Sequence, residues 1–282
     1  MRGRWPNLFI VGVAKGGTTS LWRYLNSHPD IYMSPFKEPH FFMGSFPPEL
    51  ALTEAEYLGL FAGATHETWL GEASTRYMLD EASPELIKRT VPEARILISL
   101  RDPAERAYSD YWSYVKFGLE SRPFEAVVAE ELDEPDFDAD PYKLLVYPGF
   151  YATHVERYLS VFGDKVHIGF LEDLRSDAQG EVRSILEFLG ADAFQADELP
   201  PEAHNSFALP RNWAAGKLMA SQRALRAGRA IFPEPWRTRV ERLVLRGGSK
   251  PPMSEAVRAR LRTVYEPDRE PLERVLGRRL PW

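Results

Sequence analysis

Short apolar runs recur along the first two thirds of the chain and predict strands. The runs at residues 8–11, 94–100 and 166–170 do not alternate with polar residues, which is typical of strands buried on both faces. Two shorter runs, at residues 31–33 and 69–72, predict two further short strands. Amphipathic stretches separate these runs, so we expect strands and helices to alternate from residue 8 to residue 190.

Capping residues mark several helix starts in this pattern. Thr53 and Glu56 form a capping box, which predicts a helix over residues 53–61. Ser83 precedes a proline and an acid, and we expect it to cap a helix over residues 83–89. Further helices are predicted over residues 104–117 (capped by Asp102 before Pro103), 124–132, 150–162, 180–189 and 254–264, with a turn at 265–268 and a last short helix after it.

This alternation predicts an α/β fold: a central parallel sheet with helices on both faces. Residues 171–174 are expected to form a turn after a strand, and residues 200–212 a loop. Residues 213–246 are arginine-rich and are predicted to be helical. The 282 residues suffice for a core, and we expect a single domain over residues 1–282, with a helical C-terminal part from about 200 to 282.

The first strand, turn and helix predict a P-loop-like anion site. Residues 12–17 form a small-residue turn that carries Lys15, and Thr18 opens the helix. Free backbone N–H groups and the helix dipole would converge there on a phosphate or sulfate. The lysine precedes the glycines, whereas a Walker A loop has it directly before Ser or Thr. The alternative is a glycine-rich turn that binds nothing.

A second strand, turn and helix place Arg101 at the carboxyl end of the strand at 94–100. Ligands of open α/β sheets bind at such strand ends. An arginine there can hold a second anionic group through paired hydrogen bonds. The alternative is an ion pair between Arg101 and Asp102 or Glu105.

Residues 34–42, SPFKEPHFF, form a third candidate segment. Lys37, Glu38 and His40 put three ionisable groups within four positions, and two prolines keep the segment irregular. A carboxylate held between prolines is suited to act as a general base, which makes Glu38 a candidate. For Phe41 and Phe42 we expect burial in the core.

Composition and charge exclude several classes of protein. The formal net charge of −6 argues against nonspecific nucleic-acid binding. The chain has no cysteine, so disulfides and thiolate metal sites are impossible, and no metal-ligand motif such as HExxH occurs. No apolar run approaches the ~20 residues of a membrane span, and the N-terminus lacks a signal-peptide pattern. We therefore expect a cytoplasmic protein without metal; the oligomeric state stays open.

Together these segments resemble the sulfotransferases that use 3′-phosphoadenosine 5′-phosphosulfate (PAPS). The resemblance is to the heparan sulfate N- and 3-O-sulfotransferase branch and its bacterial relatives. Residues 11–21 (VGVAKGGTTSL) are similar to that family's 5′-phosphosulfate loop, and residues 37–42 (KEPHFF) to the segment with its catalytic glutamate. Residues 97–111 (LISLRDPAERAYSDY) resemble its 3′-phosphate motif, and residues 261–282 its C-terminal ending.

The resemblance implies roles for individual residues. Lys15 would neutralise charge on the bridging oxygen as the product adenosine 3′,5′-bisphosphate (PAP) departs, and Glu38 would deprotonate the acceptor. His40 is a weaker candidate for an acceptor contact or a second base. Phe207 is a candidate for stacking on adenine, and Arg211 for a 3′-phosphate contact. The donor-binding residues implied are Lys15, Gly16, Gly17, Thr18, Thr19 and Ser20 around the 5′-phosphate, Arg101 and Ser109 at the 3′-phosphate, and Phe207 and Arg211.

Two departures from the family pattern bear on the acceptor. The heparan branch often has lysine where this chain has Ala73, and its C-terminal disulfide is absent here. We therefore expect a bacterial-type enzyme that acts on a hydroxyl, or an amine, of a carbohydrate, lipid or secondary metabolite. Two other classes stay open from the residues alone: a P-loop-type nucleotide kinase and a non-catalytic nucleotide-binding module.

Overall fold

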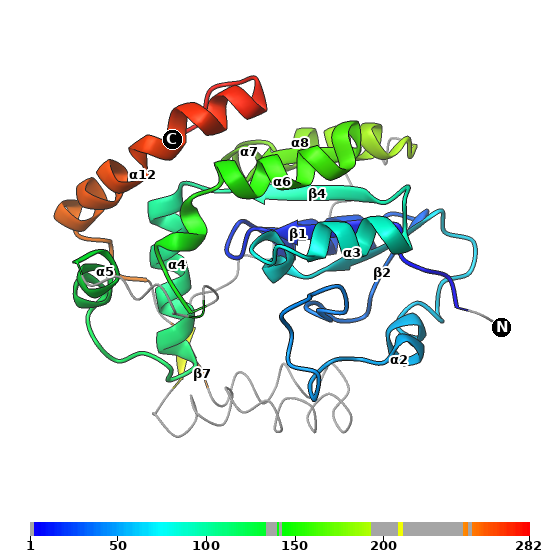
Figure 1. Ribbon diagram of the computed structural model, residues 1–282, viewed down its shortest axis with the longest axis horizontal. Helices are drawn as coiled ribbons and strands as arrows, with labels where there is room; N and C mark the ends of the chain where they lie inside the picture. Colours follow the sequence, from blue (N-terminus) through cyan, green and yellow to red (C-terminus); the bar gives the residue numbers. More distant parts are fainter. Residues whose placement is uncertain (1–2, 134–139, 141–142, 193–207, 211–244, 248–249) are drawn as a thin grey trace.

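The computed structural model describes residues 3–133, 140, 143–192, 208–210, 245–247 and 250–282 (Figure 1). Its centre is a five-stranded sheet in the order β2-β3-β1-β4-β5, in which every neighbouring pair is parallel. The five strands are β1 (Leu8–Gly12), β2 (Ile31–Met33), β3 (Trp69–Ala73), β4 (Arg95–Leu100) and β5 (Val166–Phe170).

Helices cover both faces of this sheet, because alternate side chains of β1 point to two separate cores. Leu8 and Ile10 belong to a cluster that also holds buried residues of α1 (Thr18–Asn26), α7 (Leu171–Ser176) and α8 (Ala178–Leu189). Phe9 and Val11 belong to the opposite cluster, with α3 (Ser83–Thr90), α6 (Ala152–Phe162) and part of α12 (Glu255–Leu276). The predicted α/β fold with a central parallel sheet is thus confirmed.

A third apolar cluster lies beside the sheet. It joins α4 (Pro103–Lys116), α5 (Phe124–Asp133) and the first half of α12, around Tyr108 and Tyr265. α12 contacts both α4 and α6, and it runs across the molecule in Figure 1. The remaining elements are α2 (Glu54–Gly59), the 3-10 turns η1 (Thr75–Met78), η2 (Tyr147–Gly149) and η3 (Gly163–Lys165), and the antiparallel pair β6 (Ala208–Pro210) and β7 (Leu245–Gly247).

Two of the predicted caps are present and one is wrong. Thr53 and Glu56 form the full capping box of α2, and the Asp102 carboxylate accepts hydrogen bonds from the N–H groups of Ala104 and Glu105 at the start of α4. Ser83 does not cap α3, whose N-cap is Ala82. The Ser83 hydroxyl instead donates to the Asp80 carboxylate at 2.7 Å, because Asp80 gathers the polar groups of the neighbouring loop.

The C-terminal prediction of two short helices with a turn between them is wrong. α12 is one helix of 22 residues that contains Pro267 and Pro271. Packing against α4 and α6 keeps it continuous, since Tyr265 and Leu272 are buried on either side of Pro267. Asp268, next to Pro267, fixes it further by accepting hydrogen bonds from the N–H groups at the start of α6.

Smaller corrections concern the connections. Residues 171–174 were expected to form a turn but lie in the short helix α7, where Leu171 and Leu174 are buried under α1. Residues 208–210, predicted as loop, and residues 245–246, predicted as helix, pair with each other through β6 and β7, a long-range contact that no local pattern encodes. The rest of the arginine-rich segment, residues 213–244, lies outside the described residues. Within the described part of the chain, no helix has the length and apolarity needed to cross a membrane.

Candidate active site

The candidate site lies at the carboxyl ends of β1 and β4, from which the chain continues toward opposite edges of the sheet. From β1 the chain continues through α1 to β2 on one side of the sheet, and from β4 through α4 and α6 to β5 on the other. Loops diverge at such a switch point and leave a crevice beyond the carboxyl ends of the strands. The Lys15 turn and Arg101 both lie at this edge, as the sequence predicts.

Backbone geometry shapes the turn between β1 and α1. The Ser99 hydroxyl donates to the carbonyl of Gly16 at 2.6 Å, and the Ser99 carbonyl accepts from the N–H of Val13. A Cβ on Gly16 would lie 2.2 Å from the Ser99 carbonyl oxygen, so only glycine fits between the two strands. Gly17 has φ +86° and is the N-cap of α1. The turn is therefore built for close backbone approach rather than for side-chain capping.

Lys15 is held inside the crevice. Its φ is +70°, and its Nζ donates to the Ser113 hydroxyl on α4 at 2.8 Å. Ser109 lies one turn earlier on α4, where its carbonyl accepts a hydrogen bond from the Ser113 hydroxyl at 3.3 Å. Burial lowers the pKa of Lys15, and Asp110 opposes this effect. The ammonium group is therefore poorly solvated, a state that favours contact with an anion.

Arg101 lies next to the Lys15 turn. One guanidinium nitrogen donates to the carbonyl of Lys15 at 3.2 Å, and another is 3.6 Å from the Glu105 carboxylate. The ion pair that the sequence left as an alternative is thus present. Arg101 is nevertheless buried, and its Nε has no hydrogen-bond partner within the described residues. A buried N–H of this kind is a vacant donor for a ligand.

Lys37 is a site residue to which the sequence gave no role. Its Nζ donates to the hydroxyls of Thr18 and Thr19 at 2.9 and 3.0 Å, so it lies directly at the start of α1. Burial lowers the pKa of Lys37, and nearby Lys15 lowers it further. The signal in the sequence was its place beside Glu38 in the KEPHFF segment, but only the fold shows which turn it reaches.

Glu38 and His40 lie in a strained loop next to the end of β3. Their φ angles are +62° and +56°, and with Lys15 they are the non-glycine residues with left-handed φ among the residues described. Such strain often collects at functional positions. The Glu38 carboxylate accepts from the N–H and the hydroxyl of Thr75 at 2.9 and 3.0 Å, and His40 Nε2 lies 3.6 Å from it.

The predicted burial in the core is confirmed for Phe42 and only in part for Phe41. Phe42 is buried in the core and contacts the ring of Phe9, whereas Phe41 is partly buried and stacks on Tyr57 with ring centroids 4.2 Å apart. The segment therefore combines a core anchor with a polar rim that faces the crevice.

Lys250 is a second cation that the sequence did not assign. Its Nζ lies 3.9 Å from the centre of the Tyr108 ring on α4. Burial lowers the pKa of Lys250 to about 8, and Arg101 and Lys15 lie close enough to contribute. Phe207 and Arg211, the predicted adenine and second 3′-phosphate contacts, lie outside the described residues.

These features suit an anionic ligand with two charged groups. The first turn of α1 has no side-chain cap and no acidic residue, and Lys37 binds the hydroxyls of Thr18 and Thr19 at its start. The buried Arg101 and the half-buried Lys250 lie beside that turn. The described residues contain no group of three or more His, Asp or Glu side chains placed to hold a metal ion.

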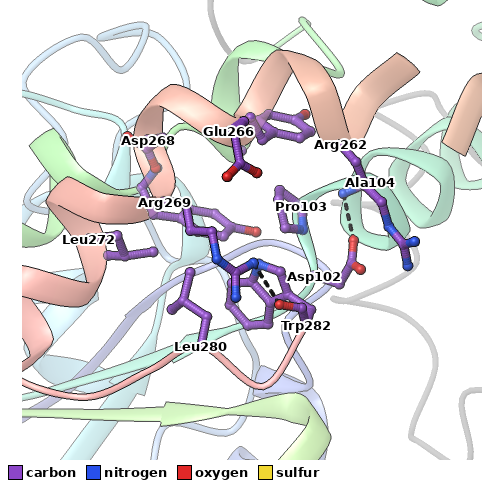
Figure 2. Close-up of a pocket in the computed structure, with 13 residues that line it drawn as sticks. Asp102, Pro103, Ala104, Arg262, Glu266, Asp268, Arg269, Leu272, Leu280 and Trp282 are labelled. Atoms are coloured by element: carbon purple, nitrogen blue, oxygen red, sulfur yellow. Dashed lines mark hydrogen bonds between the residues drawn. The ribbon is translucent and has the colours of Figure 1, made fainter. Parts of the chain in front are cut away.

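A separate cavity of about 310 Å³ lies behind Asp102 and Pro103, between α4 and α12. Figure 2 shows that Arg269, Glu266 and Arg262 reach toward it from α12 and that Trp282 closes one side, where its carbonyl accepts a hydrogen bond from Arg269. No residue predicted for the site lines this cavity. It is therefore distinct from the crevice at the strand ends.

Comparison with known proteins gives a consistent result. The family model described as "Sulfotransferase domain" matches residues 6–217. Mouse (Mus musculus) heparan sulfate glucosamine 3-O-sulfotransferase 6 is 32% identical over 191 residues, which cover 67% of this chain and 53% of that protein. The mouse bifunctional heparan sulfate N-deacetylase/N-sulfotransferase 4 is 32% identical over 197 residues, 66% of this chain and 22% of that protein.

A solved structure extends the similarity to nearly the whole chain. A sulfotransferase from Alicyclobacillus acidocaldarius matches with a TM-score of 0.74 and 30% identity, and the match covers 98% of each chain. By contrast, this chain spans about half of the first mouse relative and about a fifth of the second.

Proposed function

The chain belongs to the sulfotransferase domain family, and from this premise we propose that it transfers a sulfuryl group from PAPS to a hydroxyl or amine of an acceptor. One observation carries the proposal: the Arg101 guanidinium donates to the Lys15 carbonyl at 3.2 Å. Two cationic anchors at the ends of adjacent strands therefore border one crevice. A nucleotide with phosphate groups on both its 5′ and 3′ positions could bind both anchors at once, one phosphate at Lys15 and the other at Arg101.

On the donor side, the N–H groups from Gly17 to Thr19 would hold the 5′-phosphate, while the Gly16 N–H donates to the Val13 carbonyl at 3.0 Å and shapes the turn. Lys15 would balance the charge that develops on the leaving oxygen. Lys37, bound to the hydroxyls of Thr18 and Thr19, adds a second positive charge at the same place. Arg101 and Ser109 would bind the 3′-phosphate. The buried Arg101 Nε offers a donor for that group.

On the acceptor side, Glu38 would take the proton of the acceptor. The new bond forms between the acceptor oxygen or nitrogen and sulfur, and the bond between sulfur and the bridging phosphate oxygen breaks. The Thr75 N–H and hydroxyl fix the orientation of the carboxylate, and one third of the Glu38 side chain remains exposed. In such a displacement the protein contributes mainly positioning and charge stabilisation. His40, beside Glu38, is the weaker candidate for an acceptor contact.

The acceptor class follows from the surroundings of Glu38. Ala73, where the heparan branch often has lysine, is fully buried at the end of β3 and brings no charge to the acceptor side. We therefore propose a carbohydrate, lipid or secondary-metabolite acceptor rather than a highly sulfated polysaccharide. The protein would act as a bacterial-type cytoplasmic enzyme, without a metal.

A thermal-shift comparison tests the donor assignment. PAP should stabilise the protein strongly, whereas ATP with Mg²⁺ should have little effect, because ATP lacks the 3′-phosphate that Arg101 would bind. Stabilisation by ATP–Mg²⁺ alone would support a nucleotide kinase instead. A transfer assay with labelled PAPS against a panel of acceptors then identifies the acceptor; PAP binding without transfer to any of them would support a non-catalytic module.

A further inference from the structure

Glu72 is a carboxylate buried in the middle of β3 that the proposed reaction does not use. It has no exposed surface, and three hydroxyl groups surround it. Tyr57 and Tyr77 donate to its Oε1 at 2.7 and 2.9 Å, and Ser74 donates to its Oε2 at 2.7 Å. Burial raises the pKa of Glu72 to about 7, although the three hydroxyl donors favour the ionised form. Such a group is costly to bury and calls for an explanation.

Two of the three hydroxyls that donate to Glu72 also accept hydrogen bonds from backbone N–H groups of the strained loop. The Ser74 hydroxyl accepts the N–H of His40 at 3.1 Å, and the Tyr77 hydroxyl accepts the N–H of Phe42 at 3.0 Å. Each carboxylate oxygen is thus linked through one hydroxyl to one peptide group of the loop. A hydroxyl that donates to a carboxylate is polarised and becomes a better acceptor, which strengthens the second bond of each pair.

The loop needs this support because its conformation is unfavourable on its own. Glu38 and His40 both have left-handed φ, which is costly for residues other than glycine. The Glu38 N–H bonds to the Ala73 carbonyl at 2.7 Å, which fixes one end of the loop to β3. Bonds to Ser74 and Tyr77 fix the remainder, at His40 and Phe42. The orientation of the Glu38 carboxylate therefore depends on groups that Glu72 orders.

We propose that Glu72 is a positioning residue for Glu38, acting through the Ser74 and Tyr77 hydroxyls on the backbone of residues 38–42. This inference rests on the proposed function insofar as Glu38 is the base. It differs from a general role in stability, because it predicts loss of turnover without loss of donor binding. The donor turn between β1 and α1 shares no hydrogen bond with the three hydroxyls around Glu72 within the described residues.

The two tyrosines provide a matched pair for the test. Tyr57 and Tyr77 are both fully buried, and both donate to the same oxygen of Glu72. Only the Tyr77 hydroxyl also accepts a hydrogen bond from the loop. In Tyr57→Phe the ring remains stacked on Phe41, so that variant loses one bond to Glu72 and no bond to the loop.

We expect Tyr77→Phe and Ser74→Ala each to lower kcat by about tenfold or more, and Tyr57→Phe to change it less than about twofold. The KM for PAPS and the affinity for PAP should stay within about twofold of the parent in all three variants. Glu72→Gln keeps the shape of the side chain and one acceptor oxygen. Its kcat should therefore lie between the kcat of Tyr57→Phe and those of Tyr77→Phe and Ser74→Ala. Equal losses of kcat in Tyr57→Phe and Tyr77→Phe would overturn the inference.

Hydrogen exchange supplies a readout that does not depend on turnover. Amides of residues 38–43 should exchange faster in Tyr77→Phe, Ser74→Ala and Glu72→Gln than in Tyr57→Phe, while amides of β1 stay protected. If the parent protein transfers no sulfuryl group, the proposed function fails but the exchange pattern still tests the role of Glu72. If the parent turns over and loop exchange is unchanged in every variant, this inference alone fails.

Discussion

The two halves of the site hold their functional groups by different means. In the donor half, the turn at residues 12–17 and the start of α1, glycine allows the backbone to approach β4, and cationic side chains surround a helix N-terminus without an acid. In the base half, the loop at residues 34–42 and the end of β3, Glu38 and His40 have left-handed φ, as Lys15 has in the donor half, and side-chain hydroxyls hold the loop backbone. One half relies on backbone shape, and the other on a buried polar network.

This difference fits the task that we propose for each half. An anion is bound well by N–H groups that point to one place, and a short turn with glycine provides them at little cost. A base must instead hold one carboxylate at a set distance and direction from the acceptor. Such precision requires bonds from other elements, and Glu38 obtains them from Thr75 and from the residues linked to Glu72.

Removing one group from each half should separate binding from chemistry. Lys15→Ala should lower transfer about a thousandfold or more and weaken PAP binding, because the charge on the leaving group is no longer balanced.

Glu38→Gln should lower transfer by a factor of about 10²–10⁴ while PAP binding persists, because only the proton acceptor is lost.

Single-turnover transfer and calorimetric PAP titration of both variants measure this separation. A Glu38→Gln variant with the parent's transfer rate would remove Glu38 as the base. A Lys15→Ala variant with parent PAP affinity and parent rate would exclude Lys15 from the donor half.

The backbone of the donor half can be tested at Gly16. The added methyl in Gly16→Ala would lie 2.2 Å from the Ser99 carbonyl oxygen, so the turn must shift away from β4. We expect the free energy of unfolding to fall by about 2 kcal/mol and PAP affinity to fall by about tenfold or more. Denaturant titration and calorimetry measure the two effects.

Gly59→Ala is the matched control for this substitution. Gly59 lies at the end of α2, and no atom is within 4 Å of the position that its Cβ would take. Unfolding and PAP binding should therefore change by less than about 1 kcal/mol. Equal behaviour of the Gly16 and Gly59 variants would mean that the close approach to β4 has no role in the donor half.

A smaller effect on PAP affinity is expected from pH in the donor half. The pKa of Lys250 is lowered to about 8 by burial, with contributions from Arg101 and Lys15. Lys250 is thus cationic below pH 8 and loses its charge as the pH rises through 8. PAP affinity should fall by about threefold to tenfold between pH 7 and pH 9.

Lys250→Arg keeps the charge over this range and should show a flatter dependence of PAP affinity on pH. Identical pH dependence in the parent and in Lys250→Arg would show that Lys250 lies outside the donor half. Titrations at several pH values in one ionic strength distinguish the outcomes, because salt screens the same interaction.

The sequence predicted most of the fold because the information is local. Apolar runs define all five strands of the sheet within one or two residues, and capping patterns define the starts of α2 and α4. The sequence-based predictions were wrong where contacts between distant segments determine the local structure. Asp80 draws away the Ser83 hydroxyl, packing keeps α12 continuous through Pro267, and β6 pairs with a strand 35 residues later in the chain.

For the site, the sequence by itself determined that a glycine turn with Lys15 follows the first strand, that Arg101 lies at a strand end and that Glu38 lies in the KEPHFF segment, since each follows from residue type and neighbours within one turn or strand. Only the tertiary structure decided that Arg101 touches the Lys15 turn, that Lys37 reaches Thr18 and Thr19, and that Glu72 is linked through the Ser74 hydroxyl to the N–H of His40. The physical reason is that a hydrogen bond requires atoms to meet within about 3 Å. For residues on different elements, that distance is set by the packing of the sheet and its helices.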